Sequence, residues 1–217
     1  MKLEHKKNCF PKLFTWKELE LLINQKVYLV PERCKIDDCE IIKWPISRWD
    51  VNPNEMPPNL FYQHLENKTG VFYFRDMSKY KFQFNEICKE LEEKHRRPFD
   101  THIFVHYNNL DVPHPFGCHW DTQNNVIVQC EGETHWKVWQ QINPNDYPDE
   151  TGAGSLNLKS KPILDVVLKS GDALWLPQYY PHEAKSKTKR MSISFAGEEY
   201  MSVNSEDYIN REWVYLF

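Results

Sequence analysis

The chain has 217 residues, of which 41% are hydrophobic and 14% are aromatic, and its formal net charge is −4. A chain of this length can bury a sizeable core as one domain. The two signs of charge are interspersed and do not form the concentrated basic face that binds phosphate backbones, so we expect no nucleic-acid partner.

Neither the N-terminal residues nor the cysteines point to secretion. Met1–Cys9 is charged and has no apolar run, and no segment approaches the length of a membrane span. None of the six cysteines belongs to a Cys-x-x-Cys pair, and reduced thiols are the simplest explanation. We therefore expect a cytoplasmic protein that does not contact a membrane.

The first hundred residues combine short patterned segments with a long irregular one. Thr15–Glu18 has the sequence of a capping box, and the leucine-rich residues after it predict a short helix. Residues 41–59 are rich in Pro and Asn, which favours a loop. The apolar run Gly70–Asp76 predicts a strand.

A longer helix is predicted over Ser78–Arg97, because apolar residues recur there at helical spacing and Pro98 stops the pattern. We expect this helix, like the segments before it, to pack on the fold that follows. The residues expected on its buried face are Phe82, Ile87, Cys88 and Leu91.

A strand over Thr101–Tyr107 and a loop after it lead to the tripeptide His119-Trp120-Asp121. Residues two apart in a strand point the same way, so His119 and Asp121 can face one ion while Trp120 turns to the other side. Such a pair alone is weak evidence, because exposed polar pairs are usually just solvated. A further ligand must come from a distant strand.

Two more strands follow the tripeptide. Asn125–Cys130 and Thr134–Trp139 have the composition of strands, and the residues between them include Gly132. We predict that the two strands form a hairpin. The metal ligands would then lie on an antiparallel β scaffold.

The third candidate ligand is His182. A strand pattern over Ala173–Pro177 precedes it, and the turn up to Pro181 fixes the direction of the imidazole. Two imidazoles and one carboxylate make a facial triad, which holds Fe(II) on one side and leaves the opposite coordination positions open. This arrangement suits oxygenation better than structural metal binding.

Three other histidines form a rival metal set, namely His102, His106 and His114. His102 and His106 would share one strand face. Two histidines on one strand face are more often packed or hydrogen-bonded than bound to a metal. The set that contains Asp121 is therefore favoured.

Together these motifs resemble the JmjC-like (cupin-type) Fe(II)- and 2-oxoglutarate-dependent oxygenases. The resemblance covers roughly Thr101 to Gly197. The segments that carry it are His119–Asp121, Gln129–Trp139, Gly171–His182 and Met191–Phe195.

The fold implied by this resemblance is mainly β with flanking helices: a double-stranded β-helix (jelly-roll, cupin-like) barrel. Residues 1–217 would form a single domain of this type. Its parts would be an N-terminal preamble of helices and strands over 1–100, a barrel core with the metal site over 101–200, and a closing helix over 201–217.

A function is implied as well. His119, Asp121 and His182 would bind Fe(II), 2-oxoglutarate would chelate the metal, and dioxygen would take the last position. Oxidative decarboxylation to succinate and carbon dioxide would then drive hydroxylation. Hydroxylation of an amino-acid side chain in a protein or peptide is our first expectation, and a small-molecule substrate is the alternative.

One position departs from the family pattern. Two residues after Gly132, where many relatives carry a Lys or Arg that binds the far carboxylate of 2-oxoglutarate, this chain has Thr134. A buried dicarboxylate needs a cation or several hydrogen-bond donors, because an unpaired buried charge is costly. The Thr134 hydroxyl can supply one such bond.

A replacement for the missing cation is expected from elsewhere in the barrel. Arg190 is one option, and alternation would place it on the same face as Ser192. Lys137 is another, although its odd offset from Thr134 predicts that it faces outward.

Asn108 or Tyr107, if turned inward, would also form a hydrogen bond with the cosubstrate or the substrate, and Gln129 is expected to point inward. The residues predicted to bind the cosubstrate are Thr134, Arg190, Asn108 and Ser192.

Two other functions stay open at this point. A metal-binding cupin without oxygenase activity would share the fold, but such proteins often use a His-x-His pair followed by Glu, whereas here the second position is Asp121. A degenerate oxygenase that binds metal but not 2-oxoglutarate is the other alternative, and Thr134 motivates it. The sequence indicates neither the oligomeric state nor the identity of the substrate.

Overall fold

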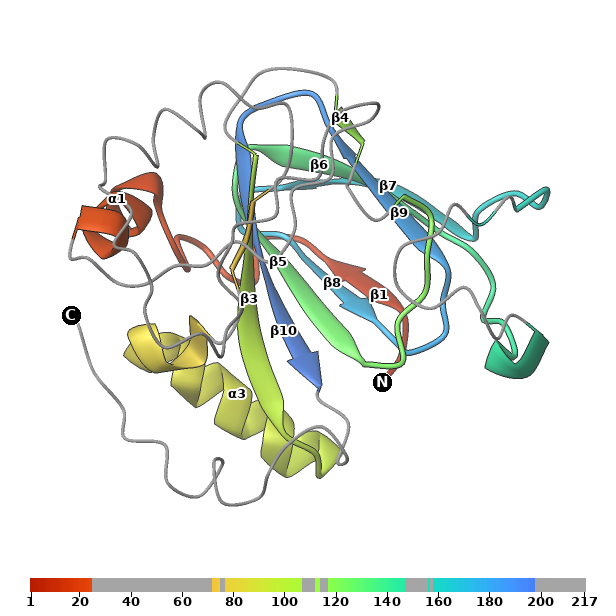
Figure 1. The fold of residues 1–217 in the computed structure, drawn as a ribbon, viewed down its shortest axis with the longest axis horizontal. Coiled ribbons are helices and arrows are strands. Elements are labelled where there is room, and N and C mark those ends of the chain that lie inside the picture. The colour runs from red at the N-terminus through yellow and green to blue at the C-terminus, as the bar shows by residue number, and fades with distance from the viewer. Residues whose placement is uncertain are drawn as a thin grey trace, which may run out of the picture.

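The computed structural model describes residues 1–24, 72–74, 77–106, 112–113, 117–146, 156 and 158–197. These residues form two antiparallel sheets that face each other, with helices on the outside (Figure 1). The mainly β class predicted from the sequence is confirmed, and the two facing sheets fit a jelly roll.

The larger sheet has six strands in the order β1-β8-β5-β10-β3-β2, and the smaller has four in the order β4-β9-β6-β7. The strands of the larger sheet are β1 (Glu4–Lys6), β8 (Ala173–Leu176), β5 (Asn125–Glu131), β10 (Arg190–Gly197), β3 (Phe99–His106) and β2 (Phe72–Phe74). Those of the smaller sheet are β4 (Val112–Pro113), β9 (His182–Ser186), β6 (Glu133–Val138) and β7 (Leu164–Lys169).

The hairpin predicted from β5 and β6 is wrong. β5 pairs with β8 and β10 in the larger sheet, whereas β6 pairs with β7 and β9 in the smaller one. The turn between them contains Gly132 at a φ of +68°, and it carries the chain from one sheet to the other. Both faces of β5 are buried, and its two edges pair with strands that come much later in the chain.

The N-terminal helix has the predicted capping box. α1 (Trp16–Asn24) begins after Thr15, whose Oγ1 accepts a hydrogen bond from the Glu18 backbone N–H, while the Glu18 carboxylate accepts one from the Thr15 N–H. Lys81 Nζ binds the same carboxylate at 2.5 Å. This ion pair ties α1 to the start of the longer helix.

The longer helix predicted from the sequence is two separate helical elements in the structure. Met77–Tyr80 forms a short 3₁₀ helix, η1, and α3 runs from Phe82 to His95, ending at Arg96 with a φ of 53°. The predicted range Ser78–Arg97 therefore contains two elements. A second 3₁₀ helix, η2, spans Pro144–Asp146.

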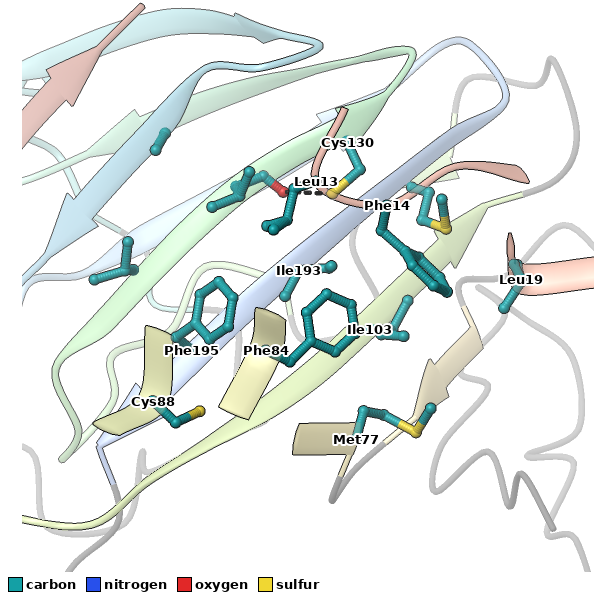
Figure 2. Close-up of a cluster of buried hydrophobic side chains, with 14 of the residues drawn as sticks. Leu13, Phe14, Leu19, Met77, Phe84, Cys88, Ile103, Cys130, Ile193 and Phe195 are labelled. Carbon is teal, nitrogen blue, oxygen red and sulfur yellow. Dashed lines mark hydrogen bonds between the residues drawn. The ribbon is translucent and has the colours of Figure 1, made fainter. Parts of the chain in front are cut away.

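The main hydrophobic core lies between α3 and the outer face of the larger sheet (Figure 2). From α3, Phe84 and Cys88 enter it, and Ile193 and Phe195 of β10 face them. Ile87 and Leu91 pack at its edge, as predicted. The prediction for Phe82 is wrong: its side chain is 56% exposed, because a period of 3.6 residues places it opposite Phe84.

A second core fills the space between the two sheets. Apolar side chains from five strands pack there, and this packing keeps the sheets face to face. The residues are Ile127, Trp136, Val138, Leu168, Leu174, Leu176 and Ala184.

Alternation along β10 directs two kinds of side chain to these two regions. Met191, Ile193 and Phe195 belong to the outer core. The residues between them, Ser192 and Ser194, and Arg190 at the start of the strand therefore point into the space between the sheets, and all three are buried.

No helix in the described part of the chain is long and apolar enough to cross a membrane. Several sequence predictions lie outside the described residues, and the division into a preamble, a core and a closing helix stays a prediction. The predictions outside the described residues concern the loop 41–59, the helix over 201–217, Tyr107, Asn108 and His114.

Candidate active site

The structure brings His119, Asp121 and His182 together at one end of the space between the sheets. His119 Nε2 lies 3.6 Å from Asp121 Oδ1, and His182 Nε2 lies 3.7 Å from Asp121 Oδ2. One ligand atom from each residue lies within 4.8 Å of the other two. Among the residues that the structure describes, this is the one group of His, Cys, Asp and Glu with such geometry.

A short antiparallel bridge places the two histidines side by side. The His119 N–H donates to the His182 carbonyl at 3.0 Å, and the His182 N–H donates back at 2.7 Å. His119 thus belongs to an isolated bridge rather than to a longer strand as predicted. Trp120 still turns away from the ligands, into a separate cluster with Cys118 and Trp139.

The turn before His182 also holds Asp121. Tyr179 donates its backbone N–H to the Asp121 carbonyl at 2.8 Å, and its ring packs edge-on against Trp120. Tyr179 has a φ of 65°, a conformation that favours glycine. The turn therefore fixes two of the three ligands through backbone contacts.

Both imidazoles are oriented by backbone carbonyls. His119 Nδ1 lies 3.1 Å from the Gly117 oxygen, and His182 Nδ1 lies 2.9 Å from the Tyr180 oxygen. A carbonyl can only accept, so each Nδ1 carries the proton and each Nε2 presents its lone pair. Burial, reinforced by the neighbouring His119, lowers the pKa of His182 to about 4, and this keeps the ring neutral, as a metal ligand must be.

The carboxylate of Asp121 is oriented by a residue that the sequence did not single out. Asn125 Nδ2 donates to Asp121 Oδ2 at 2.8 Å, and Ser194 Oγ donates to Asn125 Oδ1 at 3.1 Å. Asn125 is the first residue of β5, and a polar residue at a strand start is common. The two hydrogen bonds of its side-chain amide, seen in the structure, show the role.

The donor set fits a divalent transition metal. Metal–ligand bonds of roughly 2.1 Å place neighbouring ligands about 3 Å apart in an octahedron, so a small contraction of the observed distances completes the site. Two neutral imidazoles and one carboxylate on one side leave the opposite positions for other ligands.

Further along the interior, several buried polar atoms have no hydrogen-bond partner. They include Thr134 Oγ1, Arg190 Nε and Gln129 Oε1. Arg190 and Gln129 are fully inside, as alternation predicted. Lys137 instead reaches Glu183 at 3.5 Å on the outer face, which confirms that it points away.

The rival histidines lie on the interior face of β3, and both are buried. His102 faces Ser194 and His106 faces Arg190 across the strand pair. In the described part of the chain, neither joins a carboxylate in a metal-like group. They are therefore neighbours of the site rather than its ligands.

The sequence pattern of the JmjC domain matches residues 81–204, which is more than half of the chain. The chain belongs to the JmjC domain family. The matched range contains all three members of the His-Asp-His group and both sheets' central strands.

Curated relatives of this JmjC chain are much longer proteins. The bifunctional lysine-specific demethylase and histidyl-hydroxylase NO66 of Drosophila grimshawi is 28% identical over 140 residues, covering 64% of this chain and 19% of that protein. The Caenorhabditis briggsae protein of the same name is 24% identical over 143 residues, covering 63% of this chain and 18% of its own length. The JmjC chain thus spans about a fifth of the length of these relatives.

Among solved structures, the JmjC chain is similar to YcfD, a ribosomal oxygenase from Escherichia coli, crystallised in complex with cobalt and 2-oxoglutarate. The TM-score is 0.58 and the identity 18%, over 96% of this chain and 50% of that one. At this identity the likeness shows that the fold is shared.

Proposed function

We propose that this JmjC protein is an Fe(II)- and 2-oxoglutarate-dependent oxygenase that hydroxylates an amino-acid side chain of a protein or peptide. The observation that carries the proposal is the group of His119, Asp121 and His182, with both Nε2 atoms and the carboxylate directed at one point. The open side of such a triad is what a chelating cosubstrate and dioxygen require.

Each residue of the site has a defined task in this proposal. His119, Asp121 and His182 would hold the metal, and Asn125 would keep the carboxylate in its ligating orientation. When bound, iron supplies the activation of dioxygen that is coupled to decarboxylation of 2-oxoglutarate to succinate and carbon dioxide. The ring of Trp136, whose centroid is 5.8 Å from that of His182, shields the site from water.

A protein or peptide substrate is supported by the relatives. The NO66 proteins are named as histidyl-hydroxylases and lysine-specific demethylases, and YcfD is named as a ribosomal oxygenase. Both names describe oxygenases, and one names an amino-acid side chain as the target. We therefore place this protein among the side-chain hydroxylases and keep a small molecule as the alternative substrate.

A reducing compartment and a single domain are parts of the same proposal. All four cysteines in the described residues are free thiols, which supports a cytoplasmic location. The pairing of β1 with β8 and the packing of α3 on β10 support one domain in which the N-terminal residues cover the core.

The test is succinate formation by anaerobically prepared protein with Fe(II) and 2-oxoglutarate after oxygen is admitted. We expect slow turnover without substrate, a loss of at least about 100-fold in His182→Ala, and no loss in His135→Ala. His135 is the matched control because it lies on the outer face of β6 against Asp165. Candidate protein substrates are then screened by mass spectrometry for the gain of one oxygen atom.

The opposite result is equally clear. Stoichiometric metal binding by the wild-type protein, with neither 2-oxoglutarate binding nor succinate, would establish a metal-binding JmjC protein without oxygenase activity.

A further inference from the structure

Arg190 is a buried cation without a counter-ion in the described part of the chain. Its side chain is 2% exposed, and Nη1 donates to Ser192 Oγ at 2.5 Å. Nε has no partner, and in the described part of the chain burial alone acts on the pKa of the guanidinium, with no contribution from a carboxylate. A guanidinium buried in this way is costly unless an anion joins it.

The guanidinium keeps its charge at neutral pH. Burial lowers the pKa of Arg190 only to about 10. The protein therefore holds a positive charge inside the fold, and the cost of desolvating that charge favours the binding of an anionic ligand.

The direction of Arg190 places this charge in the same space as the candidate metal ligands. Arg190, Ser192 and Ser194 share one face of β10, and Ser194 bonds Asn125, which in turn bonds Asp121. The bond from Arg190 to Ser192 turns the guanidinium along the strand toward that end. Ser192 and Ser194 are about 7 Å apart along a strand, a span that suits the extended carbon chain of a dicarboxylic acid.

Thr134 supplies a second unused donor on the opposite sheet. Its Oγ1 is buried and has no partner. Gly132, two residues earlier, packs on the backbone of Arg190 so closely that an added Cβ would lie 3.0 Å from Arg190 Cα. The turn thus brings the start of β6 next to the start of β10, and alternation directs Thr134 inward.

We propose that Arg190, assisted by the Thr134 hydroxyl, binds the distal carboxylate of the dicarboxylate cosubstrate. The proposal rests on the function proposed above and deepens it. Many relatives carry the cation at the β6 position that Thr134 occupies here. In this chain the cation comes from β10 in the facing sheet, and it would bind the same carboxylate. A guanidinium can bind a carboxylate through two parallel hydrogen bonds, which fixes the orientation of the ligand.

The test compares two ligands that differ only at the distal end. 2-Oxoglutarate and 2-oxopentanoate share the keto acid that chelates a metal, and only the first has a distal carboxylate. Their dissociation constants for Mn(II)-loaded protein are measured by calorimetry without oxygen. We expect the wild-type protein to prefer 2-oxoglutarate by about 10- to 100-fold.

Variants of the anchor separate its charge from its packing. Arg190→Met should remove the preference while leaving the affinity for 2-oxopentanoate unchanged, which also shows that the variant is folded. Arg190→Lys should keep part of the preference. Lys185→Met removes an exposed cation on β9 and should change neither constant. Adding Thr134→Lys to Arg190→Met should restore the preference, because it returns a cation to β6.

Each contrary outcome points to one cause. If Arg190→Met still prefers 2-oxoglutarate as the wild type does, the anchor is elsewhere and the proposal for Arg190 is wrong while the proposed function stands. If the Mn(II)-loaded wild type binds neither keto acid, the proposed function fails together with the anchor.

Discussion

Asn125 donates a hydrogen bond of 2.8 Å to Asp121 Oδ2, and this bond fixes the only carboxylate of the His-Asp-His group. The same amide accepts a hydrogen bond from Ser194 on β10. Two hydrogen bonds therefore link the Asp121 ligand to β5 and β10 of the larger sheet. The position of this carboxylate does not depend only on the loop that carries it.

Asn125→Ala should weaken metal binding by about 10- to 100-fold, because removal of a residue that orients a ligand typically costs this much. Ser194→Ala should have a smaller effect in the same direction, since Asn125 keeps its bond to Asp121. Titration of the metal-free proteins with Co(II), followed by its absorption spectrum, measures both. Unchanged affinity in Asn125→Ala would mean that the backbone bond from Tyr179 holds Asp121 sufficiently.

Asp172 contributes a pH-dependent part of the stability. Burial raises the pKa of its carboxyl, but hydrogen bonds from the Asn8 and Lys169 backbones and from His5 outweigh burial and leave the pKa below its ordinary value. The unfolded state therefore binds the proton more readily. The stabilisation is complete above the ordinary pKa and is lost as the pH falls through the lowered value.

Asp172→Asn should accordingly lower the free energy of unfolding at pH 7, by about 1 kcal/mol. The difference from the wild type should shrink as the pH falls below about 4, the ordinary pKa of an Asp carboxyl, because the unfolded chain takes up the proton there before the folded protein does. Urea denaturation at pH 7 and pH 3 measures both differences. A gap that is equal at the two pH values would show that the ionised form is not what these donors stabilise.

Gly132→Ala should destabilise the protein strongly. The φ of +68° alone costs an alanine roughly 1–2 kcal/mol, and its Cβ would lie 2.2 Å from the Lys189 carbonyl oxygen, so the backbone must also shift. Glu133→Ala, at the exposed next position, should change the free energy of unfolding by less than about 0.5 kcal/mol. Chemical denaturation of both variants is the measurement, and equal stabilities would contradict the close contact.

The triad could be predicted from the sequence through its motifs, and the interior position of Arg190 through strand alternation. Ligand types and spacing single out His119, Asp121 and His182, and the structure brings them together. The alternation Met191, Ile193, Phe195 sets the phase of β10 and hence the inward direction of Arg190.

Features that depend on long-range pairing could not be predicted in this way. The turn at Gly132 indicates a change of direction, but the partners of β5 are β8 and β10, which follow it by dozens of residues. The support that Asn125 receives from Ser194 arises only because β10 pairs with β5. Local patterns contain no information on such neighbours.

The phase of α3 provides a matched pair of substitutions. Phe84 is 1% exposed and contacts Phe14 and Phe195 in the outer core, whereas Phe82 is 56% exposed on the opposite side of the same helix. Phe84→Ala should lower the free energy of unfolding by about 3–5 kcal/mol, because it removes a fully buried ring and leaves a cavity. Phe82→Ala should cost clearly less, because more than half of its side chain is exposed to solvent and its removal leaves no buried cavity. Thermal and urea denaturation of the two variants test this difference, and equal losses would contradict it.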